Sequence, residues 1–145
     1  MTIGEKRNKL MAMSTGMYTA FIDDDDMVSP DYISLVLDAI RNGYPDVIGI
    51  VGIFQGDLGR GRISKRFYHT IENNSYYTSP RGFERPPNHL NPMKREIAIG
   101  FSFEHKNFAE DTDWAMEICK AGVLKSENFV QNPIYFYNYV KDKSY

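Results

Sequence analysis

The sequence predicts an α/β fold, because a strand, a capped helix and a second strand follow one another early in the chain. Met17–Ile22 is β-branched and aromatic without a breaker, which is typical of a buried strand. Ser29–Gly43 has the signals of a helix, and Val47–Phe54 is a second apolar strand. The chain has 145 residues, the size of one domain. We therefore expect a single α/β domain over residues 1–145.

The helix between the two strands has the clearest signals. Ser29 is a favoured N-cap residue, Pro30 suits the first helical position, and Asp31 suits the positive end of the helix dipole. Asn42-Gly43 is a stop signal. The apolar residues at helical spacing, which we expect to face the core, are Ile33, Val36, Leu37 and Ile40.

Further elements are predicted on both sides of this unit. A short helix is expected from the charged run at Glu5 to Gly16, and Arg62–Tyr68 is expected to return beside the second strand as a hairpin. The proline-rich stretch Asn74–Pro92 is expected to be an ordered, irregular loop.

Two elements are predicted near the end of the chain. A helix is expected from Glu110 to Gly122, and a strand over Ile134–Val140. The helix would bury Trp114, Ile118 and Ala121, and the strand would place Tyr135, Tyr137 and Tyr139 on one face.

Composition excludes several classes of protein. With 42% hydrophobic and 25% charged residues, the chain is neither disordered nor fibrous. A net charge of −2 argues against a nucleic-acid partner. Cys119 is the single cysteine, which fits a reducing compartment, and no apolar run approaches the ~20 residues of a membrane helix. The sequence therefore predicts a cytoplasmic protein without an integral membrane segment.

Four consecutive aspartates, Asp23–Asp26, follow the first predicted strand. In extended geometry Asp23 and Asp25 would share one face, and Asp24 and Asp26 the other. The repulsion between them would be relieved by a divalent cation such as Mg²⁺ or Mn²⁺. The alternative is a solvated acidic turn that favours the start of the next helix. The residues alone leave both interpretations open.

A second acidic group, Glu110, Asp111 and Asp113, opens the later helix. Repulsion in such a cluster can leave one carboxylate basic enough to act as a general base near neutral pH. Ordinary enrichment of acidic residues in a first helical turn also explains the pattern, and on composition alone it is the favoured explanation.

Other residues are weaker candidates for a site. His89 could reach a metal or donor, although a structural histidine is the simpler explanation. Tyr76 and Tyr77 could stack on sugar rings or simply pack their loop. The basic residues of the hairpin, which could neutralise phosphate or form a solvated face, are Arg60, Arg62, Lys65 and Arg66.

Several of these segments together resemble the family 2 glycosyltransferases of the GT-A fold. Gly4–Asn8 is similar to the family's Gly-x-x-x-Arg-Asn loop and helix, and Ser14–Tyr18 leads into the strand that follows it. Phe21–Asp26 is similar to that strand and its D-x-D-D metal motif, which precedes a Pro-Asp-Tyr helix. Asn91–Glu96 continues the match, and Ala109–Trp114 looks like the family's Glu-Asp motif at the head of a helix. The resemblance implies a GT-A-like mixed sheet flanked by helices.

The resemblance implies a site for a nucleotide-sugar donor. Asp23 and Asp25 would be the D-x-D pair, with Asp25 as the direct ligand of Mn²⁺ or Mg²⁺ and Asp26 assisting. The metal would bridge the donor diphosphate and stabilise the leaving nucleoside diphosphate. Arg7 and Asn8 would lie near the nucleotide or its phosphates.

The resemblance also implies a hexosyltransferase-like reaction at the second motif. Asp111 would be the general base for a hydroxyl of the acceptor, a carbohydrate or another hydroxyl compound. That hydroxyl would attack the anomeric carbon in a single displacement with inversion. Trp114 would lie beside the acceptor or, as the residues favour, in the core.

The sequence departs from the family pattern in two places. The strands that hold the donor's base and ribose precede the Gly-x-x-x-Arg-Asn loop, where this sequence begins, so we expect a catalytic half with little of the nucleoside site. The Gln-x-x-Arg-Trp motif of processive enzymes is also missing, which argues against a polymerising synthase. An unpaired sheet edge would remain, from which a homo-oligomer is expected.

Two alternatives to an active transferase stay open. A non-catalytic binding or structural module would keep the GT-A-like scaffold without turnover. A metal-dependent phosphohydrolase could use the aspartates of Asp23–Asp26, although no catalytic His or Lys pattern accompanies them.

Overall fold

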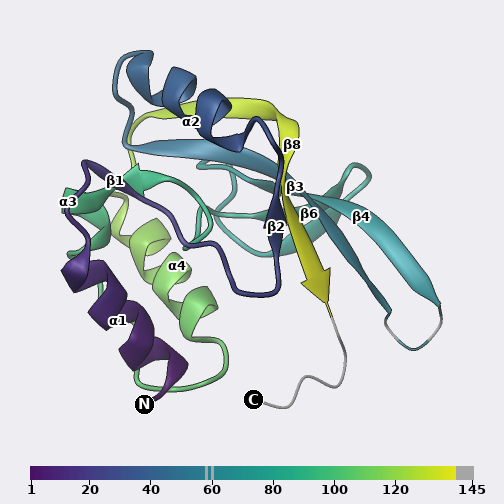
Figure 1. The fold of residues 1–145 in the computed structure, drawn as a ribbon, viewed down its shortest axis with the longest axis horizontal. Coiled ribbons are helices and arrows are strands. Elements are labelled where there is room, and N and C mark those ends of the chain that lie inside the picture. Colours follow the sequence, from purple (N-terminus) through teal and green to yellow (C-terminus); the bar gives the residue numbers. More distant parts are fainter. Residues whose placement is uncertain (58, 60, 140–145) are drawn as a thin grey trace.

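A mixed sheet runs through the molecule and carries helices on both sides (Figure 1). In the computed structural model, which describes residues 1–57, 59 and 61–139, the helices are α1 (Ile3–Met13), α2 (Tyr32–Arg41), α3 (Arg95–Ala98) and α4 (Glu110–Ala121). The strands are β1 (Tyr18–Thr19), β2 (Met27–Val28), β3 (Val47–Asp57), β4 (Arg62–His69), β5 (Tyr77–Ser79), β6 (Gly82–Arg85), β7 (Met93–Lys94) and β8 (Glu127–Tyr139).

Strand β3 is the centre of the sheet. The strand order is β1-β7-β3-β4-β6-β5, while β8 pairs with β3 and β2. Only β3–β8 and β4–β6 pair in parallel among the described strands. Because β7 is antiparallel to both β1 and β3, these two strands run in the same direction with α2 between them in sequence. The predicted α/β class is therefore confirmed.

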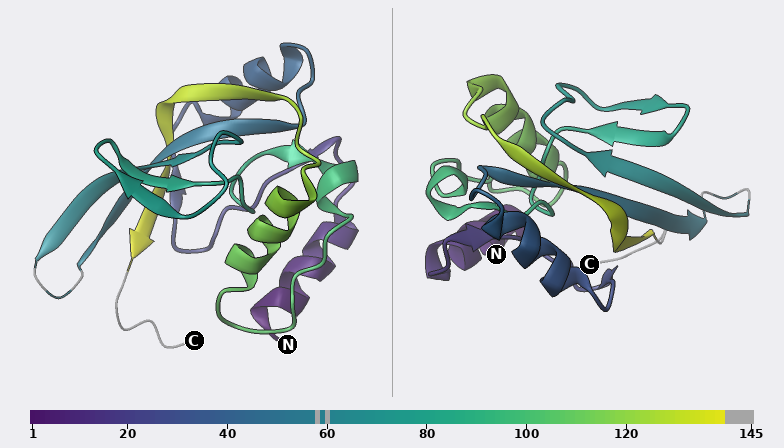
Figure 2. Two further views of the ribbon diagram at one scale, coloured as in Figure 1. Left: turned by 180° about the vertical axis from the view of Figure 1, so that it is seen from behind. Right: turned by 90° about the horizontal axis from the view of Figure 1, so that it is seen from above.

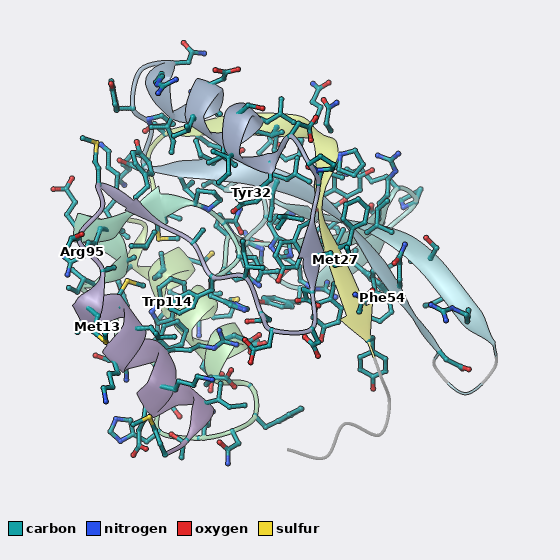
Figure 3. The ribbon with its side chains drawn as sticks, viewed as in Figure 1. Met13, Met27, Tyr32, Phe54, Arg95 and Trp114 are labelled. Carbon is teal, nitrogen blue, oxygen red and sulfur yellow. The ribbon has the colours of Figure 1, made fainter. Side chains whose placement is uncertain are left out.

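The core has two layers, one between the sheet and α2 and one between the sheet and the helices α1 and α4 (Figure 2). One cluster, which includes Tyr32, lies between α2 and the sheet, and Trp114 lies in the other, in the layer of α1 and α4 (Figure 3). The first cluster consists of Tyr32, Val36, Ile48, Ile50, Phe67, Leu90, Val130, Ile134 and Tyr135. The second consists of Met11, Val47, Met93, Ala98, Phe103, Trp114 and Ile118.

Several predicted elements are confirmed. The first helix is present as α1, although it ends at Met13 rather than at Gly16. The β3–β4 hairpin pairs from Ile50↔His69 to Asp57↔Arg62. Helix α4 is present over Glu110–Ala121, and Gly122, the predicted stop, is its C-cap with a left-handed φ of 64°.

Helix α4 and strand β8 bury most of the residues that were expected to be buried. Trp114 is buried against Phe103, at 4.6 Å between ring centroids, and its indole N–H donates to the Phe101 carbonyl. Ala121, expected in the core, is exposed. Tyr137 and Tyr139 both stack on Phe54, as a shared strand face predicts. Val140, the last residue of the predicted strand, lies outside the described residues.

The prediction of a buried strand over Met17–Ile22 is wrong. Only Tyr18 and Thr19 pair, with β7, and both are half-buried. Met17 is 65% exposed and Ile22 48%. Within the described part of the chain no strand pairs with the other side of this segment, so the apolar pattern lies at a sheet edge rather than in the interior.

Helix α2 begins later and faces the core differently from the prediction. Its N-cap is Asp31, which makes no side-chain cap hydrogen bond, and the Ser29 carbonyl accepts from the Tyr32 amide in the turn before it. Tyr32 and Val36, one turn apart, define the buried face. Ile33 and Leu37, expected in the core, are exposed because each lies one position around the helix from those anchors.

The stretch predicted as an irregular loop contains the β5–β6 hairpin. Glu84 is buried on this hairpin, where its carboxylate accepts hydrogen bonds from Asn73, Ser79 and Arg81. These bonds, chiefly those from Arg81, lower the pKa of Glu84 to about 2. A polar cluster of this kind has no hydrophobic periodicity, which explains why it was not predicted.

Candidate active site

The aspartate run forms a turn, so the expected extended geometry is wrong. The Asp26 amide donates to the Asp23 carbonyl at 3.0 Å, which folds the run back and leaves Asp24 and Asp25 exposed at its tip. Tyr135 of β8 closes the turn from inside: its hydroxyl donates to Asp26 Oδ2 at 2.6 Å and accepts from the Asp23 amide at 3.1 Å. The first and last aspartates therefore share one anchor.

The carboxylate of Asp23 lies between two basic side chains. Arg7 Nη1 is 3.1 Å from its Oδ1, and His89 Nε2 is 3.2 Å from its Oδ2. Burial by itself would raise the pKa of Asp23, but the contacts with His89 and Arg7 outweigh it and hold that pKa well below its usual value. At Asp26 burial has the larger effect and raises the pKa, against the hydrogen bonds from Tyr135 and Asn138, which lower it.

The same two basic residues reach the second acidic motif. Arg7 Nε lies 3.3 Å from Glu110 Oε1, and Glu110 is buried. His89 Nδ1 lies 3.9 Å from Asp111 Oδ2 and makes no hydrogen bond with any of the described residues. Two bridges thus join Asp23 to the Glu110-Asp111 pair, and His89, a weak candidate from sequence, forms one of them.

Helix α1 positions Arg7 by close contact with the segment before α4. A Cβ on Gly4 would lie 1.7 Å from the Glu104 carbonyl oxygen, so only glycine allows this approach. The Asn8 side-chain amide donates to the Phe103 carbonyl and accepts from its amide, at 2.8 and 2.7 Å. Asn8 therefore holds the backbone of the site, and its role as a donor contact stays a prediction.

Asp111 stands at the head of α4 beside a cavity. The residue before the helix, Ala109, has a left-handed φ of 61°, and the Thr112 amide donates to Asp111 Oδ1 at 2.9 Å. The cavity has a volume of about 270 Å³. Besides Asp111 and His89 it is lined largely by aromatic residues and one cation: Phe54, Tyr76, Phe83, Arg85, Tyr137 and Tyr139.

The acidic residues do not form a metal cage of their own. Among residues 1–57, 59 and 61–139, no three His, Cys, Asp or Glu side chains are arranged to hold a metal ion. Asp23 and Asp26 are bound inward, and Asp25 is exposed at the turn. This donor set fits a cation that takes most of its ligands from a diphosphate and water, as Mg²⁺ commonly does.

The remaining candidates are distributed between surface, cavity and core. Trp114 belongs to the core, and Tyr77 donates from its hydroxyl to Asn73 Oδ1 rather than facing the cavity. Tyr76 does line the cavity. Of the basic hairpin residues, Arg62 and Arg66 are exposed and Lys65 lies over the Phe83 ring, whereas Arg60 lies outside the described residues.

The mixed sheet and its flanking helices are those of a GT-A-like α/β domain. The family model described as glycosyl transferase family 2 matches residues 2–106. The chain therefore belongs to glycosyl transferase family 2.

Solved structures agree on the fold. The crystal structure of S. aureus TarS 1-349 is similar with a TM-score of 0.61 and 15% identity, over 94% of this chain and 40% of that chain. At this identity the likeness shows the fold alone. A comparison with curated proteins gives no match. None of the helices in the described ranges has the length and apolar character needed to cross a membrane.

Proposed function

We propose that the chain is a metal-dependent, inverting glycosyltransferase that moves a sugar from a nucleotide sugar to an acceptor hydroxyl. One observation carries the proposal: Arg7 and His89 join Asp23 of the aspartate turn to the Glu110-Asp111 pair at the edge of a cavity. Groups suited to a donor diphosphate and to an acceptor hydroxyl are thereby held side by side.

In the proposed reaction, the Asp111 carboxylate takes the proton of the acceptor hydroxyl. The hydroxyl oxygen bonds to the anomeric carbon while the bond from that carbon to the diphosphate oxygen breaks, with inversion. Asp25 would hold Mn²⁺ or Mg²⁺, and Asp23 and Asp26 would fix the turn that presents it. When bound, the ion supplies positive charge to the leaving nucleoside diphosphate. Arg7 holds both acidic motifs in register.

Replacement of the base separates binding from chemistry. Asp111→Asn should lower turnover by about 10²–10⁴-fold, the usual contribution of a general base, while the affinity for nucleoside diphosphate with Mn²⁺ stays unchanged. A nucleotide-sugar panel assayed for nucleoside diphosphate release measures the first quantity, and calorimetry the second. An equal loss of donor affinity would contradict this assignment of the base.

The alternative, a non-catalytic module with a GT-A-like scaffold, is favoured by the inward bonding of Asp23 and Asp26, which leaves few acidic groups for a ligand. It predicts a folded protein without turnover for any donor. In that case Asp111→Asn would have no catalytic effect to measure, and the panel would show no metal-dependent release.

Two further features belong to the proposal. A reaction in the cytoplasm is supported by Cys119, a free thiol and the single cysteine. A homo-oligomer is supported by the largely apolar groove between α1 and residues 18–22, lined in part by Leu10, Met11 and Ile22. Light scattering at tens of micromolar should show a dimer, and a monomer would contradict this part.

A further inference from the structure

The cavity beside Asp111 contains a cation without an acidic partner. Arg85 is half-buried in its wall, and no carboxylate of the described residues lies within 4.0 Å of the guanidinium. The neighbouring Glu84 carboxylate is bound to Arg81 instead. The hydrogen bonds of Arg85 run from Nη1 to the carbonyls of Tyr77 and Glu84, at 3.2 and 2.9 Å. Its other donors make no hydrogen bond to a residue that the structure describes.

Aromatic rings surround this cation. The Arg85 guanidinium lies 4.8 Å from the ring centroid of Tyr76 and 5.2 Å from that of Phe83. Lys65 Nζ approaches the same Phe83 ring at 4.9 Å and forms no ion pair with a described residue. Two cations from β4 and β6 thus share one ring at the cavity.

The remaining titratable groups of the cavity leave this positive charge uncompensated. Burial lowers the pKa of His69 to about 3, so this residue is neutral at pH 7. Asp111, the one carboxylate among the described residues of the lining, faces His89 at 3.9 Å. Burial also lowers the pKa of Arg85, because a half-buried cation without a counter-charge is destabilised. A bound anion would remove this cost and accept two parallel hydrogen bonds from the guanidinium.

We propose that this cavity is the acceptor site and that it binds a sugar carrying a phosphate or carboxylate group, which Arg85 recognises. The volume of about 270 Å³ lies near the lower end for small-ligand pockets and suits one sugar-sized unit. The rings of Phe54 and Tyr137, which line the cavity, would pack against the apolar face of the sugar. This inference rests on the proposed function only in calling the ligand an acceptor.

A binding experiment without donor or metal tests the site. Glucose 6-phosphate, glucuronic acid and glucose are titrated into the protein, with binding followed by calorimetry and by NMR of the aromatic side chains. We expect at least one of the two anionic sugars to bind about tenfold more tightly than glucose. Comparison of glucose 6-phosphate with glucuronic acid then shows whether the site recognises phosphate or carboxylate. Equal binding of glucose, or equal binding of inorganic phosphate alone, would overturn the proposal.

Variants locate the binding. Arg85→Gln should weaken binding of the preferred anionic sugar about tenfold without affecting binding of glucose. Arg85→Lys keeps the positive charge but loses the paired N–H donors of the guanidinium, and should weaken binding less. Arg66→Gln is the matched control, because Arg66 is an exposed cation next to Lys65 on β4. Circular dichroism checks that each variant is folded. If Arg85→Gln does not fold, Arg85→Lys is used for the test instead.

Turnover then separates the two proposals. With an anionic acceptor, Arg85→Gln should raise the KM for the acceptor and leave the KM for the donor unchanged. An unchanged KM for the anionic acceptor in Arg85→Gln would overturn the anionic site and leave the transferase intact. If the wild type binds the anionic sugar but shows no turnover, the transferase proposal is contradicted and the anion site stands. Unchanged anion binding in Arg85→Gln would overturn the site outright.

Discussion

The two acidic runs have similar composition, but the fold uses them differently. In Asp23–Asp26 a turn binds the first and last carboxylates inward and exposes the middle two. In the run at the head of α4, successive side chains diverge around the helix: Glu110 is buried against Arg7, Asp111 lines the cavity, and Asp113 pairs with Lys106 outside. A carboxylate's role therefore depends on the backbone geometry that presents it, and on which cation lies opposite.

The largest expected effect comes from removing the cation shared by both runs. Arg7→Ala would leave Glu110 buried, and Asp23 with one basic partner fewer, and should lower the free energy of unfolding by about 3 kcal/mol. Urea denaturation at pH 7 measures the change. Lys6→Ala, at an exposed position on the same helix, is the control and should change it by less than about 0.5 kcal/mol. A similar loss in both variants would show that the bridge contributes nothing specific.

A buried acid outside the site gives the next effect. Glu84→Gln should cost about 2 kcal/mol at pH 7, because the carboxylate accepts charge-assisted bonds from Arg81. Since the folded-state pKa is lowered from 4.5 to about 2, this stabilisation is present above pH 4.5 and is lost as the pH falls toward 2. Urea unfolding at pH 7 and pH 3 should show a smaller difference between variant and wild type at pH 3. The exposed Glu117→Gln provides a control, and a constant difference would contradict the role of Glu84.

The smallest effect on stability is expected at the exposed tip of the first run. Asp25→Asn and Asp24→Asn should each change the free energy of unfolding by less than about 0.5 kcal/mol. If Asp25 is the metal ligand, Asp25→Asn alone should abolish the thermal stabilisation that nucleoside diphosphate with Mn²⁺ produces. Differential scanning fluorimetry with and without EDTA measures it. Loss of the effect in both variants, or its survival in EDTA, would contradict that assignment.

The donor interaction is expected to be weak and insensitive to the base. A ligand at 100 times its Kd stabilises a fold by about 2.7 kcal/mol, which at this chain length corresponds to roughly 5–10 °C in Tm. Millimolar uridine and guanosine diphosphates with Mn²⁺ should both give a smaller shift than this, and similar to each other. A large shift for one base only would show that a nucleoside site is present in the chain.

Local patterns were sufficient for the α/β class, the β3–β4 hairpin, helix α4 and the family. Apolar periodicity and short motifs carry this information, because each depends on residues close together in sequence. The same patterns could not show that residues 17–22 lie at an edge or that Ile33 faces outward. Burial depends on which other elements are present to cover a face.

The sequence by itself determined which residue types meet at the site: the aspartate run, the Glu110-Asp111 pair and Arg7. Only the tertiary structure decided how they contact one another, since the Arg7–Glu110 contact joins residues 103 positions apart. His89 and Arg85 likewise lie at the candidate site because of contacts between separate elements. Such contacts leave no periodic trace along the chain, because they form only when the strands and helices pack together.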